Sequence, residues 1–269
     1  MTDEAIVATT PLRPWPLRWW REVLYVFAAY GAYSFVRNTF ATGSEVAAHR
    51  HGLQIMDWQT HLGINNEANI QDWFIHHFFI APGTFLRFWN IYYGTFHFIV
   101  PIIALVILFR RHADQYARWR NIIFTTTALG LIGFALYPLM PPRMFPELGF
   151  VDSIDTYGSI WSFEDGPVQK LSNQFAAMPS LHCAWALWCA LVFASIATKW
   201  WTKAFAYAYP VATVFAIVIT ANHYWLDAVG GFVTLGAGIA LGSLFTRKWR
   251  AHFVDVRTTD EEKSPNLLA

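Results

Sequence analysis

Two short stretches of this sequence carry side chains that are able to do chemistry, and the first contains a proline–serine pair. Residues 178–182 read M-P-S-L-H and lead into an apolar run. Because Pro179 suits the first turn of a helix, we expect a helix to begin here with free backbone N–H groups and the positive end of its dipole. Such a helix end binds phosphate, and Ser180 and His182 in its first turn would face the bound group.

The second stretch, residues 222–227, reads N-H-Y-W-L-D. Its His223 and Asp227 are four residues apart, which is about one turn of a helix. The carboxylate would therefore hold Nδ1 of the imidazole and leave Nε2 free to attack an electrophile. A third polar group, Arg143, ends the sequence P-P-R after a long uncharged stretch.

Together these side chains meet the needs of phosphate-ester cleavage. That reaction requires a nucleophile, positive charge around the phosphate oxygens and an acid for the leaving group. We assign the nucleophile to His223, its orientation to Asp227 and the acid to His182. The candidate phosphate ligands are Arg143, Ser180 and Lys170. The set requires no metal ion, and we expect no cofactor.

Other readings of the same residues stay open. Both histidines could be core side chains satisfied by their neighbours, or ligands of a metal, a haem or a quinone in a protein that is not an enzyme. Arg143 could anchor a helix at a membrane interface, and Lys170 could be a solvated loop residue.

The elements that must position these residues are transmembrane helices. The chain has 269 residues, of which 55% are hydrophobic and 14% charged. Stretches of 19 to 28 residues without Asp, Glu, Lys or Arg are long enough to span a bilayer as helices. They are Phe88–Phe109, Asn121–Pro142, Leu171–Thr198, Ala204–Leu226 and Ala228–Thr246. A shorter one, Val23–Val36, is extended by flanking aromatic residues, so we predict an all-α polytopic membrane protein with six transmembrane helices.

Charge distribution predicts the orientation of these helices. With six spans, 14 of the 19 Lys and Arg residues fall on one side of the membrane. By the positive-inside rule that side is cytoplasmic and contains both termini. Arg143, the start of the helix after Pro179 and the His223 turn then share the opposite face. We expect an integral protein of the bacterial plasma membrane with an extracytoplasmic site.

The expected organisation is one six-helix membrane domain at residues 19–246, between cytoplasmic tails at 1–18 and 247–269. Residues 41–83 are too long for a simple connection and are expected to form short amphipathic helices on the outer membrane surface. Residues 143–174 are expected to form an outer loop. The sequence has no internal repeat and no nucleic-acid-binding signature.

The two stretches resemble motifs of a known family. M-P-S-L-H at 178–182 and H-Y-W-L-D-A-V-G-G at 223–231 are similar to the second and third signature motifs of the type 2 phosphatidic acid phosphatase superfamily. Together with P-P-R at 141–143, they are most similar to its inositol phosphorylceramide synthase-like (inositolphosphotransferase) branch. The resemblance implies the same roles for His223, Asp227, His182 and Ser180 and a six-helix core.

Two positions depart from the broad superfamily. A lysine expected seven residues before the first-motif arginine is Leu136 here, and an arginine expected six residues before the nucleophile is Ile217. Lys170, Arg50 or Arg87 are candidate replacements for the missing cations. The departures favour the transferase branch.

The sequence therefore predicts a lipid-phosphate phosphotransferase or phosphatase that passes through a phosphohistidine. Its substrate is a lipid phosphate in the membrane, and its acceptor is water, a polyol or a lipid alcohol. The alternatives are a plain lipid phosphate phosphatase acting on phosphatidate or polyprenyl (di)phosphate, and a non-enzymatic haem-, quinone- or lipid-binding membrane protein.

Overall fold

The computed structural model describes residues 18–40, 45–159 and 174–263, and within these ranges it is helical, with a single isolated bridge between Leu139 and Ala176. The elements in chain order are α1 (Trp19–Phe40), α2 (Glu45–His61), α3 (Glu67–His76), α4 (Pro82–Arg111), α5 (Ala113–Leu136), the 3-10 turns η1 (Pro142–Met144) and η2 (Pro146–Leu148), α6 (Ser153–Tyr157), α7 (Leu181–Ile196), α8 (Trp200–Ile219) and α9 (Trp225–Lys263). The all-α class expected from the sequence is confirmed.

Among the described residues, four helices are long and apolar enough to cross a membrane, namely α4, α5, α8 and the Trp225–Thr246 part of α9. Helix α7 is apolar but has 16 residues, which is roughly 24 Å of helix at about 1.5 Å per residue. Helix α1 has 22 residues. The chain is thus a membrane protein, and these four candidate spans overlap the uncharged stretches at 88–109, 121–142, 204–226 and 228–246.

Two helix boundaries differ from the sequence prediction. Residues 110–120, which separate two of the uncharged stretches, lie on helix ends except for His112, because α4 runs to Arg111 and α5 begins at Ala113. Helix α9 continues past its expected end at Thr246 to Lys263. The stretch 247–263 contains neither glycine nor proline, so no residue in it interrupts a helix.

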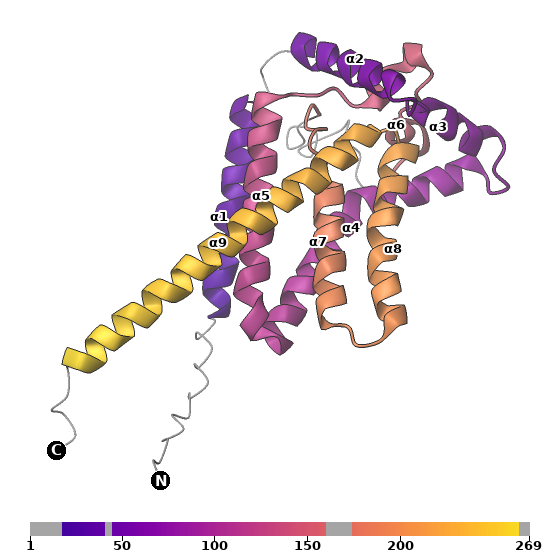
Figure 1. Cartoon of the computed structure of the whole chain (residues 1–269). Helices are drawn as coiled ribbons and strands as arrows, with labels where there is room; N and C mark the ends of the chain where they lie inside the picture. The colour runs from indigo at the N-terminus through magenta and orange to yellow at the C-terminus, as the bar shows by residue number, and fades with distance from the viewer. Residues whose placement is uncertain (1–17, 41–44, 160–173, 264–269) are drawn as a thin grey trace.

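Figure 1 shows how the helices are arranged. Helices α7 and α8 form a hairpin, and α9 crosses α5 and α7 at an angle. The segment predicted at 41–83 does contain two helices, α2 and α3, and they lie with α6 at one end of the bundle. The connection between α7 and α8 lies at the other end. The start of α7 and the start of α9 therefore face the α2–α3 end.

Close packing brings α9 against its neighbours. A Cβ added to Gly238 would meet Thr126 of α5, and one added to Gly242 would meet the backbone of Ile122. Small residues allow helices to approach in this way within a membrane. Beside this contact, Trp188 of α7 is fully buried and donates its indole N–H to the carbonyl of Trp119, 3.1 Å away. Close approach of α9 to α5, and the hydrogen bond from α7 to α5, thus hold together the helices that carry the two motif stretches.

Candidate active site

The start of α7 is joined directly to the start of α9. Ser180 is the N-cap residue of α7, and its Oγ accepts a hydrogen bond from Cys183 N at 3.5 Å. The sequence predicted Ser180 within the first turn of the helix, whereas the structure places it just before that turn. The backbone N–H of Ser180 donates to the carbonyl of Asp227 at 3.0 Å. This hydrogen bond brings the two motif stretches, 47 residues apart, into one site.

His223 is buried and held through one ring nitrogen. Its Nδ1 lies 2.8 Å from the carbonyl oxygen of Ala177 and 3.2 Å from Oδ2 of Asp227. Because a carbonyl can only accept, Nδ1 carries the proton, and in the neutral ring the lone pair is on Nε2. Among the described residues, Nε2 has no hydrogen-bond partner. The ring is thus in the tautomer that a nucleophilic imidazole needs.

Asp227 is fully buried and serves two groups at once. Its Oδ2 accepts from the His223 ring and also from the backbone N–H of Tyr224 at 3.0 Å. The Tyr224 hydroxyl donates to the carbonyl of Met140 at 3.0 Å, and burial raises the pKa of this phenol, so that it stays neutral. The predicted His–Asp contact is therefore present, but the shorter contact to Ala177 could not be read from the spacing.

His182 is held by aromatic contacts from α4. Its ring centroid lies 4.2 Å from that of Tyr93 in a stacked arrangement and 4.2 Å from that of His97. The ring centroids of His182 and His223 are 5.4 Å apart. The Nε2 atom of His182 is buried without a hydrogen-bond partner among the described residues. The two histidines named from the sequence therefore do meet, each with an uncommitted nitrogen.

The contribution of α4 to this site was missed in the sequence reading. Tyr93 and His97 are four residues apart in an uncharged stretch, and Nδ1 of His97 lies 2.7 Å from the carbonyl of Tyr93. The available signal was the histidine itself, because ionisable residues within a transmembrane helix are functional candidates.

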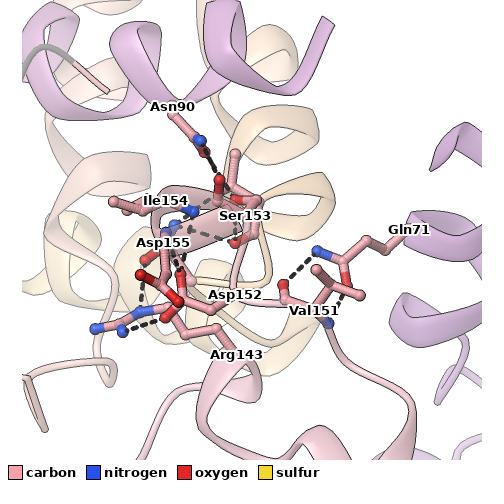
Figure 2. Close-up of polar contacts among 10 residues, drawn as sticks. Gln71, Asn90, Arg143, Val151, Asp152, Ser153, Ile154 and Asp155 are labelled. Atoms are coloured by element: carbon pink, nitrogen blue, oxygen red, sulfur yellow. Dashed lines mark hydrogen bonds and ion pairs between the residues drawn. The ribbon is translucent and has the colours of Figure 1, made fainter. Parts of the chain in front are cut away.

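Arg143 lies beside the His223 turn, and its guanidinium is already engaged. Its Nε donates to Oδ1 of Asn222 at 3.1 Å, and its Nη1 forms an ion pair with Oδ2 of Asp152 at 3.0 Å. Figure 2 shows Arg143 directed at Asp152, whose other carboxylate oxygen accepts from the first amides of α6. A phosphate at Arg143 would have to share the guanidinium with Asp152. Lys170 lies outside the described residues.

A buried polar network holds the segment that carries Asp152. Gln71 of α3 exchanges two hydrogen bonds of 2.9 Å with the backbone of Val151. Asn90 of α4 donates to the carbonyl of Ser153 at 2.7 Å and accepts from its hydroxyl at 2.8 Å (Figure 2). The position of Asp152 is thus fixed from α3 and α4.

The two positions at which this chain lacks a superfamily cation differ in burial. Leu136 is 77% exposed, whereas Ile217 is fully buried against Cys183 and Ala228. Within the described residues, no group of three or more His, Cys, Asp and Glu side chains is arranged to hold a metal ion.

Gly231 sets the distance between the two motif helices. A Cβ there would clash with the backbone carbonyl of Ser180, whereas a Cβ at Gly236 of the same helix meets open space. We expect Gly231→Ala to destabilise the protein by about 1–3 kcal/mol, because α9 must move away from α7. Gly236→Ala gains helix propensity without a clash and should be at least as stable as wild type. Thermal unfolding in detergent measures both, and equal Tm values for the two variants would contradict the packing described here.

Comparison with known proteins found a family and a relative to which the chain is similar. The family model described as the PAP2 superfamily matches residues 53–241, which is more than half of the chain. A relative from Bacteroides thetaiotaomicron, named phosphoinositol dihydroceramide synthase, is 27% identical over 188 residues. That match covers 64% of this chain and 57% of the relative, so the chain spans little more than half of the relative's length. No solved structure matches the chain.

Proposed function

Because the chain belongs to the PAP2 superfamily, we propose that it is a membrane enzyme that transfers a phosphorylated head group from one lipid to another alcohol through His223. Family membership and the named relative support a lipid phosphotransferase or phosphatase. The observation that carries the proposal is the pairing of His223 with Ala177 and Asp227, which leaves Nε2 available beside His182.

The first step is attack of the Nε2 lone pair on the phosphorus of the donor lipid. The new P–N bond forms while the P–O bond to the leaving lipid alcohol breaks. Asp227 stabilises the positive charge that develops on the ring, and His182 gives a proton to the departing oxygen. The phosphate oxygens are held by Arg143 and by Ser180 with the first amides of α7. Lys170 is proposed as a further phosphate ligand.

In the second step, His182 acts as a base and accepts a proton. The acceptor hydroxyl passes its proton to His182 as its oxygen attacks the phosphorus. The P–N bond then breaks and His223 is restored. The scheme uses side chains and backbone amides of this chain and requires no metal ion.

The proposed acceptor is an alcohol in preference to water. The motif resemblance to the inositolphosphotransferase branch and the printed name of the relative support this choice. An inositol phosphate is thus the head group we favour, and a long-chain lipid alcohol of the dihydroceramide type is the acceptor. Transfer is expected to compete with hydrolysis.

The proposed topology has six spans, namely α1, α4, α5, α7, α8 and α9. Helices α2 and α3 would lie on the outer surface, where α2 exposes Leu53 and Trp58 and α3 exposes Trp73. Both termini are then cytoplasmic, and the site opens to the extracytoplasmic side of a bacterial plasma membrane. The 14-to-5 distribution of basic residues supports this orientation.

One assay tests the reaction type, the side of the membrane on which the site opens, and the metal requirement. Sealed right-side-out vesicles carrying the protein, or its His223→Ala variant as control, are given a panel of lipid phosphates with lipid alcohols or myo-inositol, in excess EDTA. Mass spectrometry follows the products. We expect the head group on an acceptor alcohol, water-soluble hydrolysis product outside the vesicles, and no effect of EDTA.

Each part of this assay has its own contrary outcome. Hydrolysis product alone across the whole panel would make a plain phosphatase the better reading. Water-soluble product trapped inside the vesicles would reverse the orientation. Loss of turnover in EDTA, with recovery on adding Zn²⁺ or Mn²⁺, would replace the phosphohistidine scheme with a metal-dependent one.

A further inference from the structure

Glu67, the first residue of α3, is a buried carboxylate that the proposed mechanism does not use. It is 1% exposed, and none of the ion pairs among the described residues includes it. Its partners are N–H groups: Gln59 Nε2 at 2.6 Å, Asn66 N at 3.0 Å and Trp225 N at 3.2 Å. A carboxylate is costly to bury, and here it is satisfied by hydrogen bonds rather than by a cation.

Those hydrogen bonds end at the first turn of α9. The first N–H groups of a helix have no acceptor within it. Glu67 accepts from Trp225 N, and Gln59, which is fully buried on α2, accepts from Leu226 N at 3.1 Å. The negative charge of Glu67 also lies at the positive end of the α9 dipole, where it is stabilising. Two side chains of the α2–α3 segment therefore cap the first two amides of α9.

The capped amides lie between the two members of the catalytic pair. Trp225 and Leu226 separate His223 from Asp227 in sequence. The two residues before α9 are also held through their backbone. Tyr224 N donates to Oδ2 of Asp227, and His223 N donates to the carbonyl of Ile217 at 3.2 Å. A shift of the first turn of α9 would consequently change the distance between the His223 ring and its carboxylate.

We propose that Glu67, together with Gln59, is a positioning residue that holds the first turn of α9 so that Asp227 keeps His223 aligned for attack. This inference rests on the proposed function of His223. It assigns the α2–α3 segment a direct role in the geometry of the nucleophile.

Exchange of the two side chains tests the idea. Glu67→Gln keeps the shape but removes the charge, and we expect the rate of phosphoenzyme formation per folded molecule to fall about tenfold with KM unchanged. Gln59→Glu alone places two carboxylates together and should lower the Tm. The double variant Gln59→Glu/Glu67→Gln restores one carboxylate facing one amide, and it should return to within about threefold of the wild-type rate.

Thr126→Ala is the control, because Thr126 is equally buried but its hydroxyl bonds to the carbonyl of Ile122 in its own helix α5 rather than to the first turn of α9. It should lower the Tm while the rate per folded molecule stays near wild type. A wild-type rate in Glu67→Gln, or a double variant no better than Glu67→Gln alone, would overturn the proposal.

Hydrogen exchange separates failure of this inference from failure of the proposed function. The amides of residues 225 and 226 should exchange faster in Glu67→Gln than in wild type, with or without any substrate. Unchanged exchange would refute the positioning role. Absence of a phosphoenzyme in the wild-type protein, with the exchange result as expected, would instead refute the proposed chemistry and leave Glu67 as a cap of α9.

Discussion

Replacement of His223 by alanine is expected to reduce turnover at least about a thousandfold and to abolish the covalent phosphoenzyme. The reason is that Nε2 of His223 is the nitrogen held with its lone pair free, through the contacts of Nδ1 with Ala177 and Asp227. His182 is held in a separate position by its stacking on Tyr93, so it would have to move to replace the ring of His223. The measurement is turnover together with acid-labile phosphate trapped on the protein.

The chain offers a matched control for this variant on α3. His76 and Asp72 have the same four-residue spacing, with 2.9 Å between Nδ1 and Oδ1, but both side chains are largely exposed. His76→Ala should therefore retain wild-type turnover. Asp227→Asn should resemble His223→Ala in direction, because the amide no longer stabilises a positive ring, whereas Asp72→Asn should have no effect. Normal turnover in His223→Ala would eliminate the mechanism.

Replacement of His182 by alanine is expected to cost roughly a hundred- to ten-thousandfold with a lipid alkoxide as leaving group. The buried Nε2 of His182 is the proposed proton donor, and its ring lies 5.4 Å from that of His223. A p-nitrophenyl phosphate ester needs little protonation of its leaving group, so the penalty should shrink with that substrate. The comparison of the two substrates within one variant separates loss of the acid from general damage to the fold.

The same variant should also trap the intermediate. With the activated substrate, attack by His223 remains possible, while the second step lacks the base that accepts a proton from water or an alcohol. Phosphate should therefore accumulate on His223 in His182→Ala, where mass spectrometry of acid-labile phosphopeptides detects it. Phosphate found on His182 of the wild-type protein would exchange the two roles.

The positions of the four candidate spans among the described residues and the pairing of His223 with Asp227 could be read from the sequence, because both depend on local properties. Uncharged stretches of sufficient length favour lipid wherever they occur in a chain. Residues four apart can meet across about one helical turn, so the spacing predicted the contact of His223 with Asp227, although His223 lies two residues before α9 begins. The proline and serine before the apolar run located the start of α7 to within two residues, because the helix begins at Leu181 with Ser180 as its N-cap and Pro179 outside it.

Only the tertiary structure decided what surrounds these residues. The carbonyl of Ala177 that sets the tautomer of His223, the rings of α4 that hold His182, and the pairing of Arg143 with Asp152 all join different segments of the chain. The same is true of Glu67, which is 158 residues from the amide that it caps. Such contacts depend on how the helices pack, and neither residue spacing nor hydrophobic periodicity contains that information.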